Sequence, residues 1–422
     1  MKKKIILIVV LIILIIGSGV GGYLYYDSHQ KALMKEQELE EHEEQLKKEK
    51  ELLNDIKSNY NEFVKTNKEA KLYKLVEEKY QEIGTLANNT NLSLAIVEDI
   101  TINHQYFKLA NHDYYVFYRD IEPSEKIKED SYYKNYIPFD YHIITKKPTN
   151  FYIDEQLIYS INESLELSVI MEDESNYYVN FDNRLFAIKK ENVEKKSDYN
   201  QDSKVAKEIA VLNYHFFYDP DNGEVCNEII CLTKQNFEEQ LKYLKENNFY
   251  TATMHDLSLW LEGKIRLPEH SVVITIDDGA MGTDTYLIEL LEKYDMHGTL
   301  FLVTSWWSKD KYASPNLEIQ SHGHNLHERS TNGLGKAMFM TKEQILVDLK
   351  ESIATLNGEN TAFCYPFYHS NDTVMNAVKE AGFKLGFLGG NVKITQEDNP
   401  YQLNRYIIFS YSTMSQFKRM VN

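Results

Sequence analysis

The sequence predicts an α/β domain over residues 204–422, preceded by a transmembrane helix, a helical stalk and a small all-β domain. Three patterns lead to this prediction. Residues 5–26, just after a short basic tail, are uncharged and apolar for 22 residues, and the stretch after them is rich in helix-forming residues. The middle of the chain has short aromatic runs, and the carboxyl-terminal half alternates helix-like and strand-like segments. With 422 residues and 43% hydrophobic side chains, the chain can bury the cores of about two or three domains.

Residues 1–4 form a basic tail before the apolar run Ile5 to Tyr26. As a helix this run measures roughly 33 Å, enough to cross a hydrocarbon core of ~30 Å. The lysines predict a cytoplasmic tail, with the remainder outside the cell and anchored in the cell membrane by a single pass. The alternative is a cleaved signal peptide whose apolar core runs from Ile5 to Ile16. We favour the anchor because no small-x-small cleavage site is clear.

Residues 27–85 are predicted to form a helical stalk. The stretch Asp27 to Ile83 contains neither glycine nor proline and is dense in Glu, Lys, Gln and Leu, which are strong helix formers. Some leucines hint at seven-residue spacing, so a homodimer through a coiled coil is one interpretation. Because the heptads are imperfect, a single solvated helix is preferred. These leucines are Leu33, Leu39, Leu46 and Leu53.

Residues 86–197 are predicted to form a small all-β domain. Their runs alternate and are rich in aromatic residues, as in Tyr114 to Tyr118, Tyr141 to Ile144 and Tyr177 to Phe181. The domain resembles the small Src-homology-3-like barrels attached to bacterial wall enzymes, which implies binding of glycan or peptide in the wall. A rigid spacer without a ligand is the alternative. A polar linker, residues 198–203, follows.

The α/β domain begins at residue 204. Residues 286–294, 342–356 and 374–381 are predicted helices, and residues 298–303 a buried strand. Such alternation favours parallel strands with a site at their carboxyl ends.

The net charge of −18 and a pI near 5.2 argue against nucleic acid and anionic wall polymers as partners. No basic surface would attract a polyanion. A neutral glycan suits this charge better.

Asp277 and Asp278 stand side by side at the end of the apolar run Ser271 to Ile276. Two adjacent carboxylates cannot both ionise freely, so one tends to bind a cation while the other acts as a base with a shifted pKa. An Asp-Asp-Gly turn is the structural alternative.

Three histidines follow in residues 321–327, after a second strand-like run from Leu317 to Gln320. His324 and His327 would share a helix face, and His322 and His324 a strand face, whereas His322 and His327 meet only across a loop. Spacing leaves these three pairings open. Zinc accepts any of them with an Asp oxygen as third ligand and a water in the fourth place. The pattern therefore indicates a metal-dependent hydrolase.

These motifs and Phe363-Cys364-Tyr365-Pro366-Phe367 resemble those of the polysaccharide deacetylases, carbohydrate esterase family 4 or the NodB-homology family. The resemblance covers Lys204 to Asn422. It is closer to the branch that de-N-acetylates poly-N-acetylglucosamine of biofilm matrix, where the two metal histidines are also five apart and the motif order is circularly permuted. In that branch the general-acid histidine lies upstream of the Asp pair, where this chain has Leu212-Asn213-Tyr214-His215. The implied fold is a distorted (β/α) barrel of about seven strands.

The resemblance implies Asp278, His322 and His327 as metal ligands. It implies Asp277 as the general base that takes a proton from water, and His215 as the general acid that protonates the departing amine. The implied cofactor is a divalent metal, with zinc preferred and cobalt or nickel as alternatives.

Tyr365, Pro366 and Phe367 are implied to bind substrate and to supply a backbone N–H to the oxyanion. Tyr365, Phe367, Trp306 and Trp307 are candidates for stacking on sugar rings, with buried packing as the alternative interpretation.

This chain departs from the family pattern at several positions. Gly323 stands where many relatives have Ser or Thr, and His324 adds a nitrogen beside the metal ligands. The third motif often begins with an arginine that orients the base; here Cys364 occupies that stretch, and Tyr368 stands where glycine is usual. Arg405 is the candidate for the missing arginine, and a surface or interdomain charge is its alternative role.

Cys226 and Cys231 bracket four residues and are predicted to form a short-loop disulfide, which an extracellular location permits. Cys364 is predicted to be a buried thiol.

We therefore expect a membrane-anchored, extracellular enzyme that removes acetyl groups from an N-acetylglucosamine polysaccharide. Poly-N-acetylglucosamine is the first candidate substrate and peptidoglycan the second. A catalytically silent glycan-binding scaffold is the alternative from another class of function.

Overall fold

The computed structural model describes residues 28–51, 54, 63–95, 106–125, 132–198 and 204–422. The predicted anchor at residues 5–26 and the tail at residues 1–4 lie outside these residues. Among the described residues, no helix has both the length and the apolar character needed to cross a bilayer. The described residues fall into two compact units. The first holds those up to Glu129 together with Lys147–Ser164 and Phe181–Arg184, and the second holds the others.

The predicted stalk is helical over residues 28–51, and most of its side chains are exposed. The prediction of helix through residue 85 is wrong, because the chain forms strands from Phe63 onward: β1 (Phe63–Thr66), β2 (Ala70–Val76) and β3 (Lys79–Leu86). Glu77 and Glu78, with φ of 46° and 62°, form the tight turn between β2 and β3.

Burial explains why these strands overrule a helix-forming composition. Val64, Ala70 and Leu72 are completely buried, while their neighbours along the strand are exposed or half-buried. This alternation is that of a pleated strand with one face against a core. Propensity is a weak preference that such packing exceeds.

Strands in the first unit form two antiparallel arrays, ordered β4-β1-β7 and β9-β10-β3-β2-β6-β5. The further members are β4 (Asn91–Ser93), β5 (Tyr106–Lys108), β6 (Tyr114–Phe117), β7 (Ile121–Pro123), β9 (Thr149–Ile153) and β10 (Gln156–Ile161).

The second unit contains the antiparallel order β14-β8-β11-β12. Residues 86–197 are thus rich in strands, as predicted, but they divide between the two units and the strands begin at Phe63. They do not form one small domain, and the likeness to Src-homology-3 barrels stays a prediction. The strands here are β8 (Tyr141–Thr145), β11 (Glu166–Glu172), β12 (Asn176–Phe181), β13 (Arg184–Lys189) and β14 (Val193–Asp198).

A largely parallel sheet forms the centre of residues 204–422, in the order β23-β22-β21-β20-β19-β15-β24. Only β24 runs antiparallel to its neighbour. Short strands β18 (Tyr250–Thr251) and β25 (Tyr406–Ile407) add to β19 and β15, and β16 (Phe216–Tyr218) pairs with β17 (Cys231–Thr233). The main strands are β15 (Glu208–Tyr214), β19 (Ser271–Asp278), β20 (Gly298–Leu302), β21 (Leu317–Ser321), β22 (Ala362–Cys364), β23 (Leu385–Phe387) and β24 (Ile394–Thr395).

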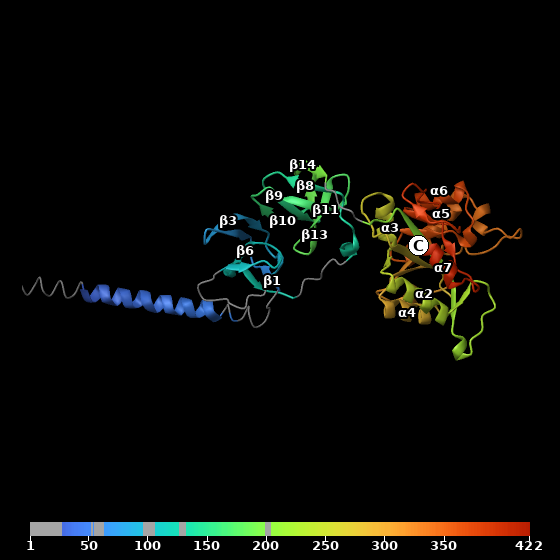
Figure 1. Ribbon diagram of the computed structural model, residues 1–422, viewed down its shortest axis with the longest axis horizontal. Coiled ribbons are helices and arrows are strands. Elements are labelled where there is room, and N and C mark those ends of the chain that lie inside the picture. Colours follow the sequence, from blue (N-terminus) through green and yellow to red (C-terminus); the bar gives the residue numbers. More distant parts are fainter. Residues whose placement is uncertain (1–27, 52–53, 55–62, 96–105, 126–131, 199–203) are drawn as a thin grey trace, which may run out of the picture. The chain divides into compact units, whose positions relative to one another are not determined.

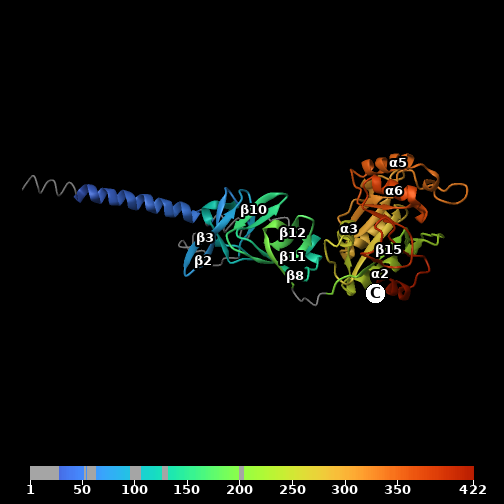
Figure 2. The ribbon, with the colours of Figure 1, turned by 90° about the horizontal axis from the view of Figure 1, so that it is seen from above.

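Helices cover this sheet, with α2 beside α4 and α5 beside α6 (Figure 1). Figure 2, turned by 90°, also shows α5 and α6 side by side. The α/β alternation predicted from the sequence is confirmed, while closure into a barrel stays a prediction. The helices are α2 (Lys234–Glu246), α3 (Met254–Leu261), α4 (Ile288–Tyr294), α5 (Lys342–Thr355), α6 (Asp372–Glu380) and α7 (Met414–Val421).

All eight residues of β19 are buried. Ile274 and Ile276 belong to one apolar cluster with helices α2 and α4, and Val273 to another that includes Trp260 of α3. Packing on both faces fixes the position of this strand. The position of Asp277 and Asp278, at its carboxyl end, is therefore fixed as well.

Thr341→Ala should lower the stability of this domain by about 1 kcal/mol, because Thr341 caps α5 in a reciprocal capping box with Gln344. Urea unfolding would measure the loss. Thr355→Ala at the other end of α5 removes only an exposed bond to the Glu351 carbonyl. An equal loss in both variants would contradict the capping argument.

Candidate metal and hydrolase centre

The turn after β19 sets the direction of the two carboxylates. Asp278 has φ +74° and Gly279 has φ +79°. A Cβ atom on Gly279 would lie 2.6 Å from Leu302 Cδ1, so the positive φ and this contact together favour glycine at the second position. Aspartate tolerates the left-handed region better than most side chains. The turn lets the side chains of Asp277 and Asp278 meet different partners.

Asp278, His322 and His327 bring three donor atoms together. Asp278 Oδ1 lies 3.1 Å from Nε2 of His327 and 3.4 Å from Nε2 of His322. The three donor atoms lie within 4.8 Å of one another, and Asp278 and His322 are buried. Asp278 Oδ1 is a buried acceptor with no hydrogen-bond partner among the described residues. Two nitrogens and one carboxylate oxygen facing one point fit a divalent cation.

Of the three histidine pairings left open by spacing, the structure forms the one between His322 and His327. The ring of His324 points away from the candidate metal ligands. Its Nδ1 lies 3.0 Å from Thr304 Oγ1, and its Nε2 lies 3.4 Å from Glu351. Nδ1 of His322 donates to the Cys364 carbonyl oxygen at 2.8 Å. This bond places the lone pair of His322 on Nε2, the atom that faces Asp278.

Asp348 of α5 holds the loop between the two histidines. Its carboxylate is buried and accepts from the backbone N–H of His324 at 2.8 Å and of Asn325 at 2.6 Å. A Cβ atom on Gly323, where φ is +84°, would lie 3.3 Å from Asp348 Oδ1. Glycine at position 323 therefore lets the loop approach this carboxylate closely.

Arg405 lies against Asp277, as hypothesised from the sequence. Its Nη1 and Nη2 atoms donate to the two carboxylate oxygens at 2.7 and 2.8 Å. Nη1 also donates to Thr275 Oγ1 and Nε to the Leu388 carbonyl oxygen. Arg405 is completely buried, which excludes the alternative of a surface charge.

The charge of Arg405 controls the ionisation of Asp277. Burial alone would raise the pKa of Asp277, but the guanidinium outweighs burial and lowers this pKa from 3.8 to about 2. The contribution of Asp277 to stability is therefore present above pH 3.8 and is lost as the pH falls towards 2. Burial also disfavours ionised Asp278, yet the two histidines lower its pKa further still.

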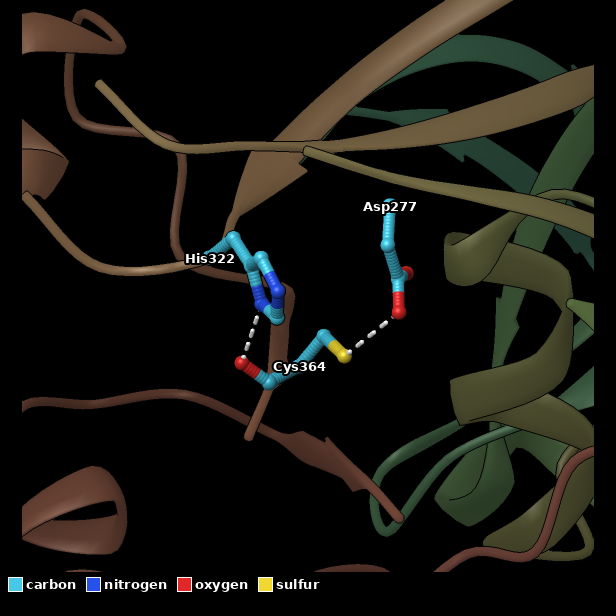
Figure 3. A group of neighbouring side chains, drawn as sticks. All are labelled: Asp277, His322 and Cys364. Atoms are coloured by element: carbon cyan, nitrogen blue, oxygen red, sulfur yellow. Dashed lines mark hydrogen bonds between the residues drawn. The ribbon is translucent and has the colours of Figure 1, made fainter. Parts of the chain in front are cut away.

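Figure 3 shows a second cluster of donor groups, Asp277, His322 and Cys364. Cys364 Sγ lies 3.5 Å from Asp277 Oδ2 and 2.8 Å from Arg405 Nη2. A guanidinium in contact with both the sulfur and the carboxylate opposes a cation there. Cys364 is the buried free thiol that the sequence predicted, and burial raises its pKa.

His215 follows β15 and is buried beside the same carboxylate, with Nε2 3.9 Å from Asp277 Oδ2. Its Nδ1 has no hydrogen-bond partner among the described residues. Burial lowers the pKa of His215, and the negative charge of Asp277 partly opposes this.

In the segment Tyr365 to Phe367, Phe367 lies next to the candidate metal ligands. The centroid of its ring is 4.3 Å from that of the His327 ring. Tyr365 is completely buried and donates its hydroxyl to the Tyr401 carbonyl oxygen, so stacking of its ring on a sugar is excluded. Pro366 has no N–H and the Tyr365 N–H donates to Phe387. The Phe367 N–H is therefore the candidate oxyanion donor of this segment.

Trp306 and Trp307 are 49% and 38% exposed. The Trp306 ring lies 5.0 Å from that of His327, so it is available for a ligand at the site. Cys226 and Cys231 are disulfide-bonded, as predicted.

Sequence reasoning missed Asp348 and the contact that Tyr368 makes with His215 at 3.3 Å. A signal existed for Asp348, because it is a carboxylate on the apolar face that Ile345, Leu349 and Ser352 bury in α5.

Comparison with known proteins gives one family and several relatives. Residues 264–386 match the family Polysaccharide deacetylase. Poly-beta-1,6-N-acetyl-D-glucosamine N-deacetylase of Staphylococcus aureus strain MSSA476 is 26% identical over 239 residues, which are 51% of this chain and 81% of the relative. The protein of the same name from Staphylococcus epidermidis is 26% identical over 242 residues, 51% of this chain and 82% of the relative.

Among solved structures, IcaB from Ammonifex degensii is similar with a TM-score of 0.44 and 18% identity, covering 52% of this chain and 97% of that one. Streptococcus pyogenes deacetylase PplD in complex with acetate gives a TM-score of 0.42 and 19% identity, covering 51% and 98%.

Asp348→Asn should weaken binding of zinc by roughly 10–100-fold, because an amide cannot accept both N–H groups of the loop that carries the histidines. Competition with a chromophoric chelator on the metal-free protein would measure the affinity. Glu351→Gln changes an exposed carboxylate one turn away on the same helix and should leave the affinity near that of the wild type. Equal weakening in both variants would contradict a specific role for Asp348.

Arg405→Met should destabilise the domain by about 3–5 kcal/mol, because it leaves the buried Asp277 carboxylate unpaired. Thermal unfolding would show the loss, and adding Asp277→Asn to the same protein should recover part of it. Arg266→Met removes an ion pair with the half-exposed Asp140 and should cost about 1 kcal/mol or less. If the double variant were no more stable than Arg405→Met alone, the loss would not arise from the unpaired carboxylate.

Proposed function

We propose that this chain removes acetyl groups from N-acetylglucosamine units of an extracellular polysaccharide, because it carries a polysaccharide deacetylase domain. Enzymes with this domain are hydrolases that act on amide bonds. The observation that carries the proposal is the convergence of Asp278, His322 and His327, with Asp277 and His215 beside them. The names of the relatives favour poly-N-acetylglucosamine as the substrate.

Each site residue has a separate role in the proposed amide hydrolysis. A divalent ion held by Asp278, His322 and His327 would polarise the acetamide carbonyl and acidify water. Asp277 is ionised and accepts a proton from the attacking water. The Phe367 N–H donates to the oxygen on which negative charge develops. His215 protonates the amine as the C–N bond breaks, so that acetate and a glucosamine unit leave.

The donor set favours zinc without fixing the metal, since two histidines and one aspartate also bind cobalt or nickel. We further propose that the apolar run at residues 5–26 anchors the chain in the cell membrane with the catalytic domain outside. The disulfide of Cys226 and Cys231 is typical of proteins outside the reducing cytoplasm. The acidic net charge, −18, suits a neutral glycan as partner.

Release of acetate from poly-N-acetylglucosamine oligomers and from peptidoglycan fragments tests this proposal, using the full chain in detergent. Release should stop after chelation and return with zinc or cobalt. Release from peptidoglycan alone would make peptidoglycan the substrate. A folded, metal-loaded protein that releases acetate from neither would leave a glycan-binding scaffold as the better interpretation.

Asp277→Asn should abolish release, by a factor of about 10² or more, because the amide cannot accept the proton from water. The variant should keep its metal, since Asp277 is not among the three donors. Asp140→Asn, an exposed change, serves as the control. Activity that persisted in Asp277→Asn would show that another group is the base.

A further inference from the structure

The turn after β22 contains Tyr368, a residue without a role in the mechanism above. Phe367 and Tyr368 have φ of +59° and +61°. This left-handed conformation is unfavourable for residues with large side chains. Two such residues in succession persist only where the surrounding contacts fix them, so the position of the Tyr368 side chain is tightly determined.

Space for the Tyr368 ring comes from a glycine. A Cβ atom on Gly389 would lie 3.0 Å from Cγ of Tyr368. The guanidinium carbon of Arg405 lies 5.6 Å from the ring centroid. Packed between these neighbours, the ring extends its hydroxyl to the end of β15.

The hydroxyl of Tyr368 makes two contacts there. It donates to Oδ1 of Asn213 at 2.8 Å and lies 3.3 Å from Nε2 of His215. Asn213 is buried, and its own amide N–H donates to the Tyr214 carbonyl oxygen. Because the hydroxyl proton is directed to Asn213, the phenolic oxygen is an acceptor towards His215. A neutral His215 must then carry its proton on Nε2.

We propose that Tyr368 is a positioning residue for the proton donor: its hydroxyl fixes the His215 ring and keeps the ring proton on Nε2. That nitrogen lies 3.9 Å from Asp277 Oδ2, on the side of the candidate centre. The inference rests on the proposed function, in which His215 protonates the leaving amine. To act as an acid the ring first takes a second proton, on Nδ1, from solvent. The Nε2 proton then passes to the amine nitrogen as the C–N bond breaks, which leaves a neutral ring, and Tyr368 keeps its own proton on Asn213.

Tyr368→Phe tests this role, because it removes the hydroxyl and keeps the ring. For acetate release, kcat should fall about tenfold, the effect of losing one hydrogen bond, while KM changes little. Tyr214→Phe is the control, since it removes a buried hydroxyl from the same end of β15 that donates to Gln240 instead, and its kcat should equal that of the wild type. An equal fall in both variants would overturn the proposal.

A second measurement needs no turnover. In the full chain with ¹⁵N-labelled histidine, the ring signals of His215 are identified by their loss in His215→Asn. They should report a proton on Nε2 in the wild type and a shift towards Nδ1 in Tyr368→Phe. An unchanged tautomer would overturn the proposal even if kcat falls. If the wild type releases no acetate, the proposed function fails, and this spectrum still decides what Tyr368 does.

Discussion

The buried ion pair between Arg405 and Asp277 is the interaction on which the rest of the site depends. The guanidinium also donates to Thr275 in β19 and to the Leu388 carbonyl oxygen after β23. It therefore joins the carboxyl-terminal segment to the strand that carries both carboxylates. A charge this deeply buried is stable only when its partners are all in place. The site is consequently larger than residues 264–386, since Arg405 and His215 both lie outside that stretch.

Much of the site could be predicted because its residues belong to short local patterns. A strand ending in Asp277-Asp278 and a histidine cluster after the next-but-one strand place their side chains at the same edge of a parallel sheet. Spacing alone did not choose among the histidine pairings. The structure does so through Gly323 and Asp348, which shape the loop between His322 and His327.

The sequence was least informative where distant segments meet. Residues 63–86 have a helix-forming composition, and only burial of residues such as Leu72 against other strands makes them extended. Arg405, the partner of Asp277, lies 128 residues further along the chain. The family resemblance made it a candidate, but no local pattern operates over that separation, so a surface or interdomain charge stayed the alternative. Tyr368 stands where the family resemblance leads us to expect glycine, and only the structure shows that Gly389 provides the space for its ring.

The two carboxylates do not compete for one environment. The backbone turns into the left-handed region at Asp278, so Asp277 contacts Arg405 while Asp278 lies beside two histidines. Arg405 lowers the pKa of Asp277, and the two histidines lower that of Asp278. The sequence suggested a base with a shifted pKa, and the shift is downward.

A carboxylate with a pKa of about 2 is a weak base towards ordinary water. It can accept a proton readily only from water that has itself been made acidic, which is the chemistry that a cation at the neighbouring donor set would supply. The lowered pKa of Asp277 therefore agrees with the proposal that Asp278, His322 and His327 hold a divalent cation.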